Sequence, residues 1–268
     1  MKAVLKYPGA KHNLSSWITS FFPEHKAYLE PFCGSAAVFF QKIPAPLETL
    51  NDIDGEIVNL FEVIRSAPKE LARQIYFTPW SREELYKSYN ANIPDLENIE
   101  RARIYLARSW QSIGNGQRHK NGFKHSVAPN GPVCAKAWAY LPDTILQAAE
   151  RLKNAQIENS DAIELIRKFN DKETLIYIDP PYPLSTRKNY LYRHEMTDAD
   201  HVRLLDAVID SKSMIVLSGY DCELYNDRLA GWQRYSKKQN VEAAQTRTET
   251  LWMNFRPEMT IDELEMMT

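Results

Sequence analysis

Four consecutive residues, Asp179 to Tyr182, have the groups with which a protein can hold an amino group. They follow the apolar run 174–178, TLIYI, which is typical of a buried strand. Because neither Pro180 nor Pro181 has a backbone N–H, this loop offers only acceptors: carbonyl oxygens and the Asp179 carboxylate. An amino group can donate two hydrogens there, and Tyr182, displayed in the loop, can stack on the ring that bears it. The alternative is a Pro-Pro turn that ends a strand beside an incidental tyrosine.

Two earlier strand ends also have polar or small residues. Segment 30–36 reads EPFCGSA, and its Gly34 and Ser35 would let the backbone approach a ligand and aim a helix N-terminus at it. Asp52 ends an apolar strand and could accept hydrogen bonds from ribose hydroxyls. Each has a structural alternative, because strand-to-helix turns often contain glycine and an aspartate here often caps a helix. The two segments indicate a nucleotide-like ligand only in combination with residues 179–182.

These strand ends meet at one edge only if the sheet is parallel. The opening third predicts strands at 27–32 and 47–52 and helices at 35–42 and 55–66, which is a βαβα unit. Later residues predict strands at 154–159, 174–178 and 214–218, and helices at 161–169 and 197–211, the second capped by Thr197. Residues 232–240 and 248–255 alternate as an antiparallel edge hairpin does. We therefore expect an α/β fold with ligands at the carboxyl ends of its parallel strands.

The middle of the chain, residues 67–154, differs in pattern and in charge. It predicts helices at 81–89, 98–113 and 139–153, with Ser81 and Asn98 as caps, and a loop at 114–132 with three Asn-Gly pairs. From Ser66 to Asn154, 13 Lys and Arg stand against 8 Asp and Glu, whereas the remainder has 20 against 27. Residues 101–141 contain no acid. A basic, mainly helical insertion in an otherwise acidic protein predicts a polyanionic partner.

Composition argues against several other classes of protein. Cys33, Cys134 and Cys222 are widely separated and form no CxxC pair, which indicates reduced thiols. The six histidines are dispersed without an HExxH pattern, so we expect no metal. The first residues lack the apolar stretch of a signal peptide, and no segment has the apolar length that spans a bilayer. We expect a cytoplasmic protein with no membrane association.

In the order of its motifs, the sequence resembles the Dam-type family (D12 class, alpha group) of adenine-specific DNA methyltransferases, which use S-adenosylmethionine. KYPGAK at 6–11 is similar to the family's N-terminal Lys-Trp-Ala-Gly-Gly-Lys segment, and EPFCGSAAVFF at 30–40 to its Phe-x-Gly-x-Gly cofactor turn. NDIDGEIVNLF at 51–61 is similar to the acidic strand end, DPPY at 179–182 to the catalytic tetrad, and VLSGYD and TETLWMNF to the closing strands. Tyr7, Ala10 and Ala36 depart from the pattern, at positions where the family has Trp, Gly and Gly.

The resemblance implies a Rossmann-like methyltransferase fold, mostly parallel with an antiparallel C-terminal hairpin. Residues 1–66 and 155–268 would form the catalytic domain that binds S-adenosylmethionine, and 67–154 a target-recognition insertion that binds DNA. The expected reaction is site-specific methyl transfer to the exocyclic amine of an adenine flipped out of double-stranded DNA. The expected setting is a bacterial or phage-infected cell, with restriction-modification as one role. We expect a monomer in solution that can pair as a dimer on DNA.

The resemblance also implies residue roles. Asp179 and Pro180 would accept the hydrogens of the amine, and Pro181 and Tyr182 complete the catalytic group. For the cofactor we expect Tyr7 and Lys11 at the methionine end, Asp52 at the ribose, Asp161 at the adenine amine, Asp179 at the border, and Glu30, Pro31, Phe32, Cys33, Gly34 and Ser35 in the loop beneath. For DNA we expect Arg108, Asn115, Arg118, Lys120 and Lys124, with Arg118 reading a base. Taken singly, Lys11 or Arg118 as a surface residue and Asp161 as a helix cap are ordinary alternatives.

Two other functions compete with this interpretation. One is an amino-methyltransferase that acts on cytosine, RNA or a protein glutamine; aspartate at the head of the tetrad favours adenine in DNA over these. The other is a catalytically inactive DNA-binding module, which the altered cofactor turn suggests and the intact tetrad at 179–182 argues against.

Overall fold

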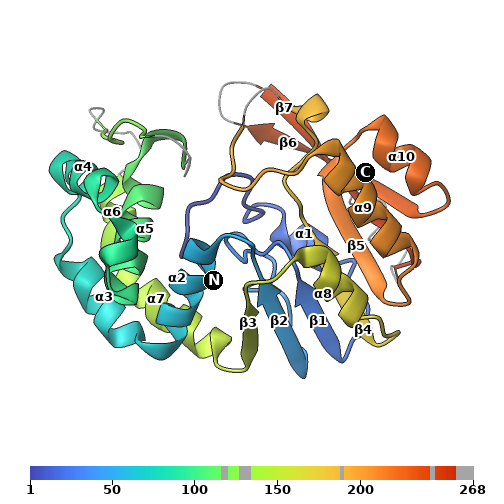
Figure 1. Ribbon diagram of the computed structural model, residues 1–268, viewed down its shortest axis with the longest axis horizontal. Coiled ribbons are helices and arrows are strands. Elements are labelled where there is room, and N and C mark those ends of the chain that lie inside the picture. Colours follow the sequence, from blue (N-terminus) through green and yellow to red (C-terminus); the bar gives the residue numbers. More distant parts are fainter. Residues whose placement is uncertain (116–119, 127–133, 188–189, 242–244, 258–268) are drawn as a thin grey trace.

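In the computed structural model, which describes residues 1–115, 120–126, 134–187, 190–241 and 245–257, seven strands form one sheet in the order β3-β2-β1-β4-β5-β7-β6 (Figure 1). The strands are β1 (Ala27–Glu30), β2 (Leu47–Asn51), β3 (Ala155–Glu158), β4 (Thr174–Ile178), β5 (Met214–Tyr220), β6 (Gln233–Val241) and β7 (Gln245–Met253). β1 to β5 are mutually parallel, and β7 inserts antiparallel between β5 and β6. This arrangement confirms the predicted α/β methyltransferase fold, edge hairpin included.

Helices cover both faces of this sheet. They are α1 (Ser15–Thr19), α2 (Gly55–Ser66), α3 (Pro68–Phe77), α4 (Arg82–Asn90), α5 (Asn98–Gln111), α6 (Cys134–Ala139), α7 (Leu141–Leu152), α8 (Ala162–Lys168), α9 (Asp198–Ile209) and α10 (Glu223–Arg228), with short 3-10 turns η1 (Ile93–Asp95), η2 (Ile113–Asn115) and η3 (Leu184–Thr186). Within the described ranges none of these helices has the length and apolarity that crossing a membrane requires.

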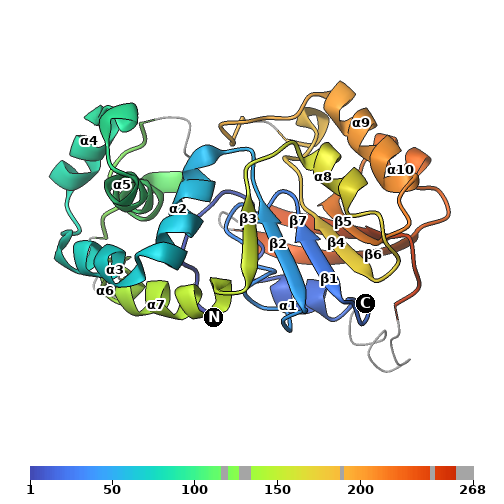
Figure 2. The same cartoon turned by 60° about the horizontal axis from the view of Figure 1, so that its bottom comes forward.

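Alternate residues of the central strands belong to two separate hydrophobic cores. Tyr28 and Leu175 pack with α1, α2 and the segment after β1, whereas Leu29 and Ile176 pack with α8, α9 and α10. Figure 2 shows the latter three helices on one side of the sheet and α1 on the other. Because both faces are covered, all five residues of β4 are buried, as its unbroken apolar run predicts. Pro180 and Pro181 end this strand because they cannot donate to a neighbouring strand.

The helices α3 to α7 lie together beside the sheet, at its β3 edge (Figure 1). They are joined to it through α2, which packs against α5 and α7. The Ser81 hydroxyl accepts from the Glu84 N–H and caps α4 as predicted. Thr197 likewise caps α9, within a full capping box with Asp200. A helical body beside the sheet is what the periodicity of residues 67–154 indicates.

Two local predictions are wrong. Residues 35–42 form turns and no helix, because Gly34 and Ala36 have φ angles of +48° and +51°. Two left-handed residues so close together prevent a regular run of helical hydrogen bonds. Asn98 does not cap α5: it is the first helical residue, no side chain caps the helix at Glu97, and the Asn98 amide oxygen accepts from Arg101 instead.

Candidate active site

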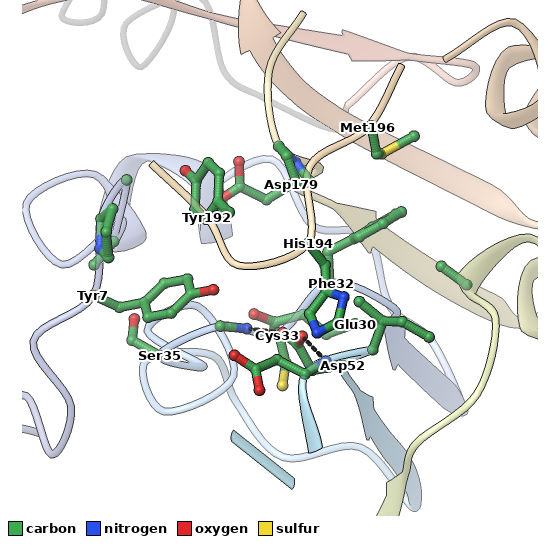
Figure 3. A pocket seen from close by; sticks show the side chains of 18 of the residues that line it. Tyr7, Glu30, Phe32, Cys33, Ser35, Asp52, Asp179, Tyr192, His194 and Met196 are labelled. Atoms are coloured by element: carbon green, nitrogen blue, oxygen red, sulfur yellow. Dashed lines mark hydrogen bonds between the residues drawn. The ribbon is translucent and has the colours of Figure 1, made fainter. Parts of the chain in front are cut away.

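A cavity of about 310 Å³ lies at the carboxyl ends of β1, β2 and β4. Figure 3 shows its side chains converging from segments far apart in the sequence. The predicted residues that line it are Tyr7, Lys11, Glu30, Phe32, Cys33, Gly34, Ser35, Asp52, Asp161, Asp179 and Pro181. Pro31, Pro180 and Tyr182 are neighbours in the chain that do not contribute to the lining. The parallel sheet therefore brings the three strand ends together, as their spacing indicates.

Asp179 follows β4, and each of its carboxylate oxygens has partners. Oδ1 accepts a hydrogen bond from the Ser218 hydroxyl of β5 at 3.0 Å and lies 3.1 Å from the Tyr182 hydroxyl. Oδ2 lies 2.8 Å from the ammonium of Lys11. Burial alone would lower the pKa of Lys11, but the carboxylates of Asp179 and Glu249 raise it above its usual range. The ammonium is therefore charged, and it neutralises the acid at the head of the tetrad.

Tyr182 is not displayed in the loop, contrary to the sequence-based expectation. Its side chain is only 7% exposed, and its ring packs edge-on against Tyr220 with centroids 4.6 Å apart. The hydroxyl is held between Asp179 and Glu249 of β7. Sequence reasoning missed Glu249 because its contact depends on the insertion of β7 next to β5, which local pattern does not reveal.

The turn after β1 is held by Asp52. The carboxylate of Asp52 accepts from the N–H of Gly34 and from the N–H of Asp54, both at 2.9 Å. A Cβ atom on Gly34 would lie 3.0 Å from the ring of Tyr7, so glycine is required both for its φ angle and for this close approach. Burial raises the pKa of Asp52 to about 7, although the two backbone N–H groups oppose the shift. The acid both builds the turn and faces the cavity.

Glu30 is the most deeply buried carboxyl of the lining. Its Oε2 accepts from the Tyr28 hydroxyl at 2.8 Å and from the Phe39 N–H at 3.2 Å, and burial raises its pKa to about 8. Pro31 lies beneath the loop, where its carbonyl accepts from the amide of Asn51 at 2.9 Å. These bonds connect the loop to the ends of β1 and β2.

Asp161 caps a helix and also lines the cavity, so its capping role is compatible with the predicted cofactor role. Its Oδ1 accepts from the N–H groups of Ile163 and Glu164, which caps α8. The same side chain is exposed and lines the cavity. Because both capping bonds reach one oxygen, the cap does not use up the carboxylate.

The segment that follows the tetrad closes one wall of the cavity, and the sequence predicted none of it. Tyr192, His194 and Met196 line the cavity (Figure 3), and so does Glu195. An ion pair between Arg187 and Glu195 holds the segment together, and Arg187 also donates to the Tyr182 carbonyl at 2.8 Å. No recognisable motif could have indicated these contacts, since they are formed within a loop.

Of the predicted DNA-binding residues, Arg108, Lys120 and Lys124 are described with their side chains, and none of the three lines the cavity. Arg108 is partly buried at the end of α5, where it donates to the Ser88 carbonyl and lies over the ring of Tyr89. Lys120 is exposed and donates to the Asn90 side chain at 3.0 Å, and Lys124 is partly buried. Arg118 and the side chain of Asn115 are outside the described residues.

The acid-free stretch is less cationic in space than in sequence. Arg101 pairs with Glu56 at 2.6 Å, and Arg103 pairs with Glu100 at 2.6 Å and also with Glu84. The neutralising acids precede residues 101–141 in the chain, so the run does not reveal them. Two of its seven bases are therefore used in packing α5.

The fold and the cavity define an α/β protein that binds a nucleotide-like ligand at the carboxyl ends of its strands and places an aspartate beside it. Comparison with known proteins gives the family. A model of the D12 class N6 adenine-specific DNA methyltransferases matches residues 7–249, and the chain belongs to this family. It is an adenine-specific DNA methyltransferase that uses S-adenosylmethionine, as the resemblance implied.

Two relatives with named activities match most of the chain. The Type II methyltransferase M1.LlaDCHI of Lactococcus lactis subsp. cremoris is 27% identical over 251 residues, with 85% of each chain covered. A DNA adenine methylase of Salmonella typhimurium is 22% identical over 247 residues, which cover 88% of this chain and 85% of the relative. Among solved structures, a putative RNA methyltransferase from Pyrococcus horikoshii aligns with a TM-score of 0.41 at 9% identity, covering 95% of this chain and 87% of that one.

The chemistry of the cavity suits this cofactor. Its lining acids are Glu30, Asp52, Asp54, Asp161, Asp179, Glu195 and Asp200, against the cations Lys11 and Arg203 and the imidazole of His194. A negative cavity fits a ligand that has a sulfonium and an ammonium group. Within the described part of the chain, the buried Oδ2 of Asp54 has no hydrogen-bond partner, so it is available to a hydroxyl or an amine. The rings of Tyr7 and Tyr192, with centroids 5.8 Å apart, supply an apolar wall.

Proposed function

We propose that Asp179 and Pro180 hold the exocyclic amine of an adenine that is flipped out of double-stranded DNA, and that residues 67–154 select its sequence context. The observation that carries this proposal is the position of Asp179 at the end of β4, on the wall of the cofactor cavity and held in place by Ser218 of β5. An acceptor there faces an amine on one side and the cofactor on the other.

The chemistry follows from this placement. The adenine amine is a weak nucleophile because its lone pair is delocalised into the ring. When bound, S-adenosylmethionine supplies an electrophilic methyl group attached to sulfur. Asp179 and the Pro180 carbonyl accept the two amine hydrogens, which favours a pyramidal nitrogen with its lone pair directed at that methyl. Transfer of that methyl would form a nitrogen–carbon bond in place of the carbon–sulfur bond, whose electron pair would stay on sulfur, and the amine would release one proton to solvent.

The amine is paired inside duplex DNA, so the base must leave the stack, at a cost of a few kcal/mol. Stacking on an aromatic ring offsets about 1–3 kcal/mol of this cost per base. Tyr182, at 7% exposed, offers such a face only after its neighbours shift. Contacts between the insertion and DNA phosphates must therefore supply the rest.

Lys124 of the insertion, together with Lys6 of the N-terminal segment, supports the proposed role of the insertion. Lys6, whose ammonium lies over the ring of Trp110 at 4.9 Å, has its pKa lowered by burial and by the nearby charge of Lys124. Two positive charges that repel each other in this way favour an anionic ligand such as a phosphate. The proposal includes Arg108, Asn115, Arg118 and Lys120 as further contacts, Arg118 reading a base. It also includes a monomer in solution that can pair on DNA, in the cytoplasm of a bacterial or phage-infected cell.

The decisive experiment replaces Asp179 by alanine. We expect transfer of labelled methyl groups from S-adenosylmethionine to unmethylated DNA to fall by at least about 1,000-fold, because the amine loses its charged acceptor. DNA affinity, measured by gel shift, should remain within about threefold. Asp210→Ala is the matched control, since this exposed aspartate at the far end of α9 should leave both quantities unchanged. Substantial residual turnover in Asp179→Ala would refute the assigned role.

A further inference from the structure

The acceptor that this mechanism requires already has donors in the structure. The Asp179 carboxylate accepts a hydrogen bond from the Ser218 hydroxyl and lies 3.1 Å from the Tyr182 hydroxyl. It also forms an ion pair, at 2.8 Å, with the ammonium of Lys11. The side chain of Asp179 is 19% exposed, so little of it is open to a ligand. The adenine amine can donate to a lone pair of the Asp179 carboxylate most directly if Lys11 or Tyr182 gives up its interaction with Asp179 and binds another acceptor instead.

A second carboxylate, that of Glu249 on β7, lies close enough to interact with both the Lys11 ammonium and the Tyr182 hydroxyl. It is 5% exposed. Its Oε1 accepts a hydrogen bond from the Tyr182 hydroxyl and lies 3.7 Å from Nζ of Lys11. Lys11 also donates to the Gly9 carbonyl at 2.9 Å, which anchors the ammonium between the two acids. A small rotation of the Lys11 side chain would thus move its ammonium from the carboxylate of Asp179 to that of Glu249.

The single hydrogen of the Tyr182 hydroxyl cannot serve both carboxylates at once. When Glu249 is ionised, it accepts this hydrogen and Asp179 does without it. When Glu249 is protonated, its own O–H can donate to the Tyr182 oxygen, and the tyrosine then donates to Asp179. The charge on Glu249 therefore determines how many donors Asp179 retains.

We infer that Glu249 is a positioning residue for methyl transfer: in its ionised form it draws Lys11 and Tyr182 away from Asp179 and leaves that carboxylate free to accept the adenine amine. Glu249 acts through these two side chains, and it does not line the cavity. The inference rests on the proposed role of Asp179.

The pKa of Glu249 is raised into a pH range in which kcat can be measured. Burial raises its pKa to about 7; the charge of Asp179 raises it further, whereas Lys11 and the hydrogen bond from Tyr182 lower it. If the ionised form is the active one, kcat rises with pH through about 7 and then levels off.

Titratable or charged groups face Glu249 from several elements. They are Lys11 of the N-terminal segment, Tyr177 of β4, Asp179 and Tyr182 of the loop after it, Tyr220 opposite on β5 and Lys237 opposite on β6. Lys237 is exposed and extends over the ring of Trp17 at 5.8 Å, so Lys11 is the buried cation of this group. Glu30, with a pKa near 8, is the other acid whose titration must be distinguished.

The test is the pH dependence of kcat, with labelled S-adenosylmethionine and unmethylated DNA both at saturation. Wild-type kcat should rise about tenfold per pH unit below about 7 and reach a plateau above it. In Glu249→Gln, kcat at pH 8 should fall at least about tenfold and the rise near pH 7 should disappear, with Kd for S-adenosylmethionine within about threefold. Glu249→Asp retains the charge and should recover part of kcat together with the rise.

Asp221→Asn is the matched control for Glu249→Gln. It removes a carboxylate from the same end of the sheet, where Asp221 is exposed and pairs with Arg234, and it should leave the pH profile unchanged. A wild-type profile in Glu249→Gln would overturn the inference, and so would a lower kcat that keeps its rise near pH 7. If Asp179→Ala is inactive while Glu249→Gln is normal, only the positioning role fails; if Asp179→Ala is active, the proposed function itself fails.

A second variant tests the idea without touching Glu249. Tyr182→Phe keeps the ring and removes the hydrogen bond that lowers the pKa of Glu249. The rise in kcat should therefore move to higher pH, whatever the loss in its plateau. A profile whose midpoint does not move would contradict the proposed link between the tyrosine and Glu249.

Discussion

At the scale of single residues, a structural role and a binding role are compatible in the same side chain. Asp161 caps α8 through one oxygen and lines the cavity, and Asp52 holds the turn at Gly34 while it faces the same space. A carboxylate has about four acceptor positions, so one or two backbone bonds leave it able to bind a ligand. These bonds also fix the direction in which the acid points. The ordinary interpretation of a helix cap or a turn acid is therefore no argument against a binding role.

Gly34, in the turn after β1 that lines the cavity, offers a residue-scale prediction. Gly34→Ala should weaken the binding of S-adenosylmethionine about tenfold and lower the free energy of unfolding by about 1 kcal/mol, measured by calorimetry and urea denaturation. The added Cβ would lie 3.0 Å from the ring of Tyr7, so this ring, which lines the cavity, must shift by a few tenths of an ångström.

A second glycine, Gly231, distinguishes the effect of backbone strain from the effect of the contact with Tyr7. Gly231 also has a positive φ angle, +94°, but a Cβ there would have no atom of the described residues within 4 Å. Gly231→Ala should therefore lower stability and leave the affinity for S-adenosylmethionine unchanged. Equal losses of affinity in both variants would mean that backbone strain, and not the contact with Tyr7, limits binding.

At the scale of elements, charge in sequence and charge in space differ. α5 has three arginines in the acid-free stretch, yet Arg101 and Arg103 form ion pairs and Arg108 donates to a backbone carbonyl. The loop after α5 has the exposed Lys120 and the partly buried Lys124. The Lys124 backbone is held by Gln111 and Trp80, so its position in the loop is defined. The loop, more than the helix, is thus the part suited to phosphates.

Replacing Lys120 and Lys124 together by glutamine should make the salt dependence of DNA affinity less steep. If each contacts one phosphate, the slope of log K against log salt should fall in magnitude by about 2. Titrations at several salt concentrations measure it. Lys26→Gln is the control. Lys26 pairs with Glu173 at the end of the sheet opposite the cavity, so its replacement should leave the slope unchanged. An unchanged slope in the double variant would exclude these lysines as phosphate contacts.

At the scale of the whole molecule, the buried acids at the cavity and next to it should make stability depend on pH. Glu30, Asp52 and Glu249 have pKa values raised to about 8, 7 and 7, so the folded state binds more protons than the unfolded state. Their contribution is complete below the unfolded pKa of about 4 and is lost as pH rises to about 8. His12, with its pKa lowered to about 4, opposes this trend only below about pH 6.5.

The free energy of unfolding should therefore decrease between pH 6.5 and 8, by at most about 1.4 kcal/mol per pH unit for each group. Urea denaturation across this range measures the slope, and Glu30→Gln should reduce it, because this variant removes one of the titrating groups. A free energy of unfolding that stays constant or increases between pH 6.5 and 8 would contradict the raised pKa values of Glu30, Asp52 and Glu249.

Local pattern predicted most of the fold. Strands, the main helices, the edge hairpin and the caps at Ser81 and Thr197 follow from periodicity and capping residues, which act within a few positions of the chain. Prediction failed at residues 35–42, where Ala36 has a left-handed φ angle that an alanine does not signal. It also failed at Tyr182, whose burial depends on Tyr220 and Glu249 of two other strands.

The sequence by itself determined the family, the cofactor and the reaction, because the motifs at 6–11, 30–40 and 179–182 are contiguous and their chemistry depends on residue type. Only the tertiary structure decided what surrounds Asp179. Lys11, Ser218 and Glu249 are brought to it from the N-terminal segment, β5 and β7, and these contacts exist only after the sheet has formed. Buried charges interact strongly over a few ångströms, so this arrangement, which no local pattern specifies, determines whether the aspartate is free to hold an amine.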